Sequence, residues 1–161
     1  MKITRPFVYW VLVILFIWSV GKDFQLVITH QRSVDYYIFS LHDQTNLFFG
    51  FLAVTLLVDL AASYCIVRPS PSGFWICLCA LALGLVYNVV SMALALSDLA
   101  GVRSAYVAGR ELRGFPVNPD AADRIFTQAG MQATVGLTVV MTLVAAVLLV
   151  SQKWRFDPGQ P

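Results

Sequence analysis

Four long apolar segments constrain this chain more than any other feature of its sequence. A hydrocarbon core about 30 Å thick is crossed by roughly 20 apolar residues in a helix. Inside lipid the backbone must satisfy its own hydrogen bonds, and a helix does so within one segment. We therefore predict an all-α integral membrane protein, a four-transmembrane-helix bundle with an ordered outer loop between the third and fourth helices. The predicted spans are residues 6–28, 47–67, 74–97 and 130–151.

The composition excludes an ordinary soluble domain. Hydrophobic residues make up 58% of the 161 residues and charged residues 12%. Soluble domains average about 45–50% apolar and about 25% charged residues. The spans leave only short connections, so residues 1–161 are predicted to form a single membrane domain. The net charge of +2 is small and no basic stripe is present, which argues against a nucleic-acid partner.

The distribution of basic residues indicates the orientation, because short cytoplasmic segments are enriched in Lys and Arg. The four arginines between Val102 and Arg124 oppose the assignment, but they lie in a long loop that also carries acids. We predict cytoplasmic N- and C-termini, an inner turn at 68–73 and outer loops at 29–46 and 98–129, in a multi-pass protein of a bacterial inner (plasma) membrane. The basic residues on the predicted inner side are Lys2, Arg5, Arg68, Lys153 and Arg155.

The turn at 68–73 reads Arg-Pro-Ser-Pro-Ser-Gly. Two prolines and a glycine in so short a segment end one helix and begin another. The second and third spans are therefore predicted to be antiparallel neighbours.

The two outer loops also carry helix signals. Residues 104–113 are predicted to extend the third span and to end at Gly114. Asn118-Pro119-Asp120 has an N-cap residue, a proline for the first helical position and an acid for the first turn, which predicts a short helix there. In the first loop, the aromatic segment 36–39 suits a short helix at the membrane interface; a lid or docking patch is the alternative.

Small and polar residues recur at helical spacing on three of the spans. In lipid such stripes let helices approach closely, and polar groups bond across them. We expect these stripes to be packing faces. They are Cys77, Ala80, Gly84, Asn88, Ser91 and Ala95 on the third span, Gly130, Thr134, Thr138, Thr142 and Ala145 on the last, and Thr55, Asp59, Ala62 and Ser63 on the second.

Asp59 and Asn88 are the most polar residues that the sequence places well inside the spans. At about 1.5 Å of rise per residue, their depths differ by roughly 9 Å, so they are not expected to bond directly. Thr138 and Thr142 lie near the depth of Asp59, and one of them is predicted to donate a hydrogen bond to it. Asp59 is either a proton or cation site, a contact for a partner helix, or a neutral carboxyl that orients the bundle.

No catalytic, metal or cofactor motif is recognisable. His30, Asp35, His42 and Asp43 share one loop, but their spacing matches no zinc pattern. We predict no catalytic residue, no bound metal and no cofactor.

A charged cluster, Arg110-Glu111-Leu112-Arg113, follows Arg103 in the second outer loop. These side chains could bind phospholipid headgroups or an acidic partner. The alternative is a solvated helix face with local pairing between Glu111 and its neighbouring arginines.

Three functions follow from these features. The first is binding to another membrane protein, as an accessory subunit, assembly factor or immunity-type protein, or to a second copy as a homo-oligomer. The second is a small transporter or ion-conducting oligomer that uses Asp59. The third is a membrane enzyme that binds lipid headgroups. The first is preferred because of the small-residue stripes, the ordered outer loop and the lack of catalytic residues. A transport path would usually hold more than one ionisable group at membrane depth.

Overall fold

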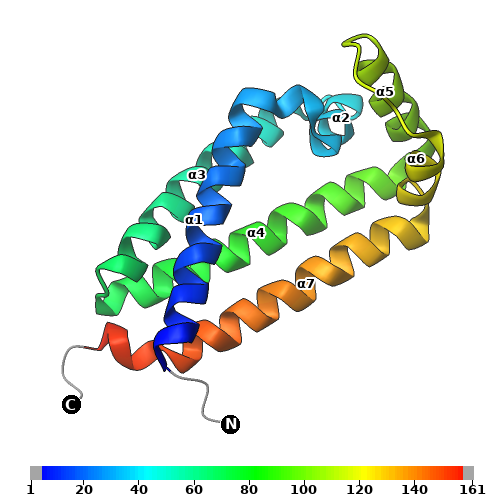
Figure 1. Ribbon diagram of the computed structural model, residues 1–161. Coiled ribbons are helices and arrows are strands. Elements are labelled where there is room, and N and C mark those ends of the chain that lie inside the picture. Colours follow the sequence, from blue (N-terminus) through cyan, green and yellow to red (C-terminus); the bar gives the residue numbers. More distant parts are fainter. Residues whose placement is uncertain (1–4, 158–161) are drawn as a thin grey trace.

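The computed structural model describes residues 5–157, and Lys2 lies outside them. Helices form nearly all of the described chain, and no strand occurs within it. Figure 1 shows their arrangement. They are α1 (Arg5–Thr29), η1 (His30–Arg32), α2 (Val34–Leu41), α3 (Thr45–Val67), α4 (Pro71–Ser97), α5 (Leu99–Glu111), α6 (Pro119–Ile125), α7 (Gln128–Ser151) and η2 (Lys153–Phe156).

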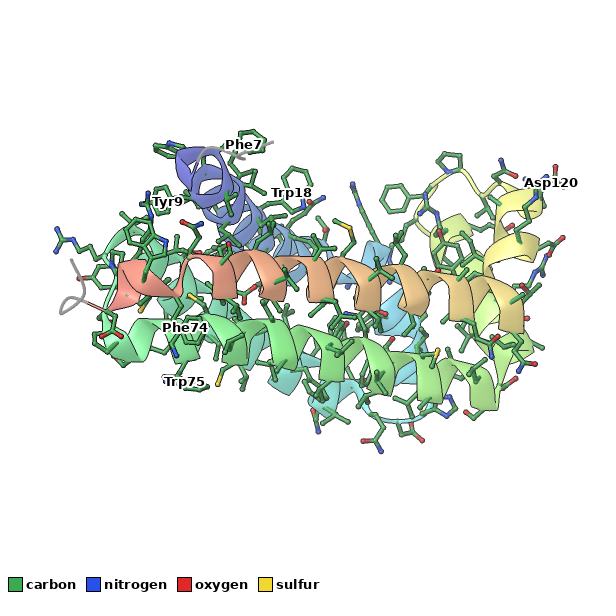
Figure 2. All side chains as sticks on the ribbon, turned by 90° about the horizontal axis from the view of Figure 1, so that it is seen from below. Phe7, Tyr9, Trp18, Phe74, Trp75 and Asp120 are labelled. Carbon is green, nitrogen blue, oxygen red and sulfur yellow. The ribbon has the colours of Figure 1, made fainter. Side chains whose placement is uncertain are left out.

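Four of these helices are long and apolar enough to cross a membrane, namely α1, α3, α4 and α7. Their bounds lie within a few residues of the predicted spans. Large aromatic side chains such as Phe7, Trp18 and Trp75 point away from the protein and are exposed (Figure 2). In a soluble protein such a surface would be costly, whereas in a bilayer it contacts lipid.

The four long helices form two antiparallel pairs, α1 with α3 and α4 with α7 (Figure 1). The pairs meet at the end that carries the α3–α4 turn, which we call the turn side. They separate toward the opposite end, where α2 lies between them and α5 and α6 lie beside it. We call that end the cap side. Because of this arrangement, α7 packs along α4 but approaches α1 only near the turn side.

The predicted hairpin of the second and third spans is confirmed as α3 and α4. Ser70 caps α4 by accepting a hydrogen bond from the backbone N of Gly73 at 3.2 Å, and Pro71 occupies the first turn. A Cβ at position 73 would lie 2.9 Å from the Cβ of Cys65. The close approach of the two helices therefore requires glycine at this position.

The predicted extension of the third span through residues 104–113 is wrong. The chain leaves α4 at Asp98, whose φ of −152° and ψ of 73° are not helical. The Asp98 carboxylate accepts a hydrogen bond from the backbone N of Gly101 at 2.8 Å and starts a separate helix, α5. An N-cap residue thus ends the span and restarts the helix in a new direction.

The other predicted loop helices are confirmed as helices. Asn118 caps α6 by accepting a hydrogen bond from the backbone N of Ala121 at 3.1 Å, and Pro119 occupies its first position. The aromatic segment 36–39 lies in α2, which Ser33 caps. Whether α2 lies at a membrane surface stays a prediction.

The buried apolar residues form one cluster at the turn side and two at the cap side. The α4 stripe is buried at both of its ends but only half-buried at Gly84 and Asn88. Along both α1 and α3, polar residues lie between the stretch that contributes to the turn-side cluster and the stretch that contributes to a cap-side cluster. The turn-side cluster comprises Val8, Leu12, Val13, Phe16, Ala62, Cys65, Ile66, Phe74, Cys77, Ala80, Leu149 and Phe156.

Candidate functional site

Asp59 is buried between α3 and α1, with 7% of its surface exposed. The Ser19 hydroxyl of α1 donates a hydrogen bond to Asp59 Oδ2. The predicted bond from Thr138 or Thr142 is wrong. Thr138 donates to the backbone O of Thr134 in its own helix, at 3.1 Å. The depth of a residue along its helix does not determine which neighbouring helix it faces. Here α1 rather than α7 packs on α3.

Asn88 has a local role. Its Nδ2 donates to the backbone O of Gly84 at 2.7 Å, one turn earlier in α4. This bond satisfies part of the amide within its own helix.

Asp23 of α1 is a second buried carboxylate, with 5% of its surface exposed. It lies close enough to Asp59 for the two charges to interact, and beside the Thr55 hydroxyl. Its Oδ2 is buried and has no hydrogen-bond partner. We name Asp23 and Asp59 the carboxylate pair.

Asp23 was not predicted as a site residue, although it lies inside the predicted span 6–28. A signal was available. Ser19 and Asp23 are four residues apart on α1, and Thr55 and Asp59 are four residues apart on α3. Residues with this spacing share a helix face, so both helices present a hydroxyl and a carboxyl together.

The carboxylate pair places two acidic groups in a low-dielectric interior. Two adjacent carboxylates cannot both remain ionised there without a compensating charge. The Lys22 ammonium acts on both carboxylates, but its side chain is exposed and forms no ion pair with either. A proton or a small cation bound at the pair would supply the compensating positive charge.

Toward the turn side the site is closed by apolar packing. Ala62 and Ile66 follow Asp59 along α3, and Phe16 precedes Ser19 on α1; all three are buried in the turn-side cluster. The Ser63 hydroxyl, one turn beyond Asp59, is buried without a hydrogen-bond partner. The buried polar side chains of α3 thus end about one helical turn from Asp59, toward the turn side.

The predicted arginine cluster makes contacts within the chain. Arg103 forms an ion pair with Asp123 of α6 at 2.6 Å. Arg110 donates to the hydroxyl of Tyr106 at 3.1 Å and to the backbone O of Pro116 at 3.2 Å.

Arg113 donates to the backbone O of Gln31 at 2.9 Å and to the Tyr37 hydroxyl, and Glu111 is exposed. These contacts fasten α5 to α6, η1 and α2. Binding of headgroups or a partner by this cluster stays a prediction.

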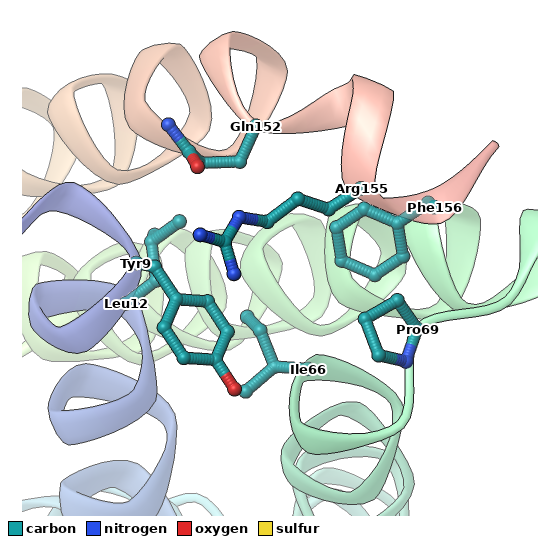
Figure 3. A pocket seen from close by; sticks show the side chains of 7 residues that line it. All are labelled: Tyr9, Leu12, Ile66, Pro69, Gln152, Arg155 and Phe156. Carbon is teal, nitrogen blue, oxygen red and sulfur yellow. The ribbon is translucent and has the colours of Figure 1, made fainter. Parts of the chain in front are cut away.

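A small depression lies at the turn side, where α1 meets α7 and η2 (Figure 3). Arg155 places its guanidinium over the ring of Tyr9, 4.4 Å from the ring centroid. Gln152 is buried beside it, and its Oε1 has no partner. The cation–π contact joins the two helix pairs at this end. The depression is lined by Tyr9, Leu12, Ile66, Pro69, Gln152, Arg155 and Phe156.

Comparison with protein-family models, with curated proteins and with solved structures finds no match to this chain. The fold and the carboxylate pair are therefore the grounds for a functional proposal.

Proposed function

We propose that this protein is a small multi-pass transporter that binds a proton or small cation at its carboxylate pair. The observation that carries the proposal is the burial of Asp23 beside Asp59, with Asp23 Oδ2 unpartnered. Ionisable groups at membrane depth are costly and generally mark an ion or proton pathway. The transport hypothesis drawn from the sequence had Asp59 as its single ionisable group at membrane depth. Asp23 supplies a second one.

The packing around the pair supports loading from the cap side. The turn-side cluster seals the opposite direction, so the present conformation is not an open pore. A transport cycle would have to separate the turn-side ends of the two helix pairs. Arg68, Lys153 and Arg155 at that end support a cytoplasmic turn side. The site would then load from outside the cytoplasm, across a bacterial inner membrane.

Infrared spectroscopy of the protein in lipid nanodiscs tests this proposal. The buffer is at neutral pH and its only cation is a bulky organic one. Under this condition we expect a carboxylic-acid C=O band from a proton held by the pair. Asp23→Asn and Asp59→Asn should each shift that band, because each changes the group that shares the proton, and the double variant should remove it. The exposed Asp157→Asn is the matched control and should leave the band unchanged.

Adding sodium or lithium separates the two possible ligands. Loss of the band on addition indicates that a small cation replaces the proton, and persistence indicates a proton site. Vesicles that contain the protein and a pH-sensitive dye should then show ion-driven or proton-driven flux that both variants abolish. A spectrum with both carboxylates ionised under every condition would contradict the proposal, as would unchanged flux in both variants.

A second candidate function is association with another membrane subunit. The packing stripe of α4 is open at its centre, because no atom beyond the neighbouring residues and backbone of α4 lies within 4 Å of where a Cβ of Gly84 would stand. Asn88 is half-buried one turn away. Small residues with a neighbouring amide are the surface that a second transmembrane helix packs against.

Gly84→Leu tests this association. If a second copy packs at Gly84, the added side chain should weaken dimerisation in vesicles by about tenfold, or roughly 1.4 kcal/mol. Energy transfer between two labelled populations at increasing lipid dilution measures the effect. Ala82→Leu, at an exposed position of the same helix, is the control and should behave as the unaltered protein. Equal energy transfer in both variants excludes self-association through this face.

A further inference from the structure

Three arginines from separate segments of the chain gather near Phe115 at the cap side, where α5 lies (Figure 1). The Cζ of Arg32 in η1 lies 4.4 Å from the centroid of the Phe115 ring, and the Cζ of Arg110 in α5 lies 5.7 Å from it. The third is Arg113, whose Nη1 donates to the backbone O of Gln31, the residue before Arg32, at 2.9 Å. We name Arg32, Arg110 and Arg113 the arginine group.

No acid neutralises the positive charge of the arginine group within the described chain. The ion pair that residues 5–157 form joins Arg103 to Asp123, so it includes none of the three arginines. Glu111 adjoins Arg110 in sequence, but its side chain is exposed and forms no ion pair with a described residue. Guanidinium groups that share one ring and one backbone segment repel one another. A bound anion would therefore stabilise their arrangement.

Arg32 and Arg113 have hydrogen-bond donors to offer such an anion. Both are exposed, and the contact that the described chain makes with the Arg32 guanidinium is with the Phe115 ring. The hydrogen bonds of Arg113 all use its Nη1, which leaves Nη2 and Nε. Both Nη atoms of Arg110 already donate within the chain, so Arg110 chiefly adds charge. Guanidinium groups bind phosphate oxygens through paired N–H donors.

The position of the arginine group along the helices suits a lipid phosphate. The 25 residues of α1 rise about 37 Å at about 1.5 Å each, slightly more than a hydrocarbon core of about 30 Å. Arg32 follows directly after this helix, at the level of the headgroups.

Two exposed apolar side chains accompany the arginine group. Leu112 stands between Arg110 and Arg113 in sequence, and Ile28 stands four residues before Arg32. Their side chains are 88% and 78% exposed, more than any other large apolar side chain of the described chain. Apolar side chains beside basic ones are typical of a surface that contacts acyl chains and anionic headgroups together. This favours a membrane lipid over a soluble phosphate.

We propose that the arginine group binds the phosphate of an anionic phospholipid in the leaflet at the cap side. Arg32 and Arg113 donate hydrogen bonds to the phosphate oxygens, and Arg110 adds positive charge. Arg103, which the sequence placed with this cluster, is not part of the site, because Asp123 already neutralises it. The inference does not depend on the carboxylate pair, so either proposal stands if the other fails.

Native mass spectrometry of the whole chain in a neutral detergent tests this site. The protein is titrated with phosphatidylglycerol, and separately with phosphatidylcholine that carries the same acyl chains. We expect phosphatidylglycerol to bind more tightly. Arg32→Gln should weaken its binding by about tenfold, the effect of losing one charge-assisted hydrogen bond. This variant should fold, because the Arg32 side chain forms no hydrogen bond within residues 5–157.

Two further variants separate a built site from general attraction by charge. Arg124→Gln removes one positive charge from an exposed arginine of α6 at the same end of the molecule. It is the matched control and should bind phosphatidylglycerol as the unaltered protein does. Arg32→Lys keeps the charge but loses the planar pair of donors, so its affinity should lie between those of Arg32→Gln and the unaltered protein.

Competition identifies the source of the anion. Glycerol phosphate carries the same phosphate without acyl chains, and a hexaglutamate peptide represents an acidic protein segment. Neither should displace phosphatidylglycerol at an equal concentration. Displacement by glycerol phosphate would indicate a soluble phosphate ligand, and displacement by the peptide would indicate an acidic protein partner. Either result would overturn the assignment to a lipid.

The lipid titrations themselves also decide the proposal. A tenfold loss in Arg32→Gln, with normal binding in Arg124→Gln, supports it. Equal affinities of these two variants would mean that the arginine group is not a specific site. Equal binding of phosphatidylglycerol and phosphatidylcholine by the unaltered protein would show that the anionic headgroup is not recognised.

Discussion

Replacing Phe39 with alanine should lower the free energy of unfolding by about 3–5 kcal/mol, as expected for removal of a fully buried aromatic side chain. Phe39 has 0% of its surface exposed. Its ring lies 5.8 Å from that of Phe48 on α3 and 6.1 Å from that of Tyr87 on α4. It therefore joins α2 to both helix pairs where they separate.

Unfolding in mixed micelles under increasing denaturing detergent measures this effect. Phe24→Ala removes the same side chain from α1 at a position that is 48% exposed, so it serves as the matched control and should cost far less. Amide hydrogen exchange should show α2 losing protection first in Phe39→Ala. Equal stability of the two variants would mean that α2 is not the joint between the helix pairs.

Replacing Gly109 with valine should separate α5 from α2. Gly109 is buried, and a Cβ there would overlap the Tyr37 ring and hydroxyl. Tyr37 has little freedom to move, because its hydroxyl donates to the backbone O of Gln31 at 2.8 Å and accepts from Arg113. Overpacking of this kind typically costs about 1–3 kcal/mol.

Thermal unfolding and limited trypsin digestion at Arg110 and Arg113 test the effect of Gly109→Val. We expect a lower Tm and faster cleavage at both arginines. The control is Gly136→Val on α7, where no atom beyond the neighbouring residues and backbone of α7 lies within 4 Å of the added Cβ. Resistance to trypsin equal to that of the control would show that Tyr37 moves aside and that the packing of α5 on α2 does not depend on this contact.

Local sequence signals predicted the elements of the fold well. Apolar length defined the four long helices, because a helix of this composition is specified by its own residues. The prolines around Ser70 defined the hairpin, and Asn118 with Pro119 defined the start of α6. Residues 104–113 were predicted to continue the third span, whereas the Asp98 carboxylate caps a separate helix, α5.

The candidate site could be predicted only in part. Asp59 was identified because a carboxyl inside an apolar span is conspicuous. Asp23, nearer the end of its predicted span, was not predicted as a site residue. Its burial depends on α3 packing against α1, and the spacing of Ser19 and Asp23 indicates a shared face without indicating which helix covers it.

By itself, the sequence determined which segments are helices, which are apolar enough to span a membrane, and how deep Asp59 and Asn88 lie along them. Depth follows from a fixed rise per residue. The tertiary structure alone decided which helices face each other, because one apolar surface packs on another without strong preference in lipid. It placed α1 rather than α7 against Asp59, and so brought Ser19 and Asp23 to the carboxyl that the sequence had assigned to the threonines of the last span.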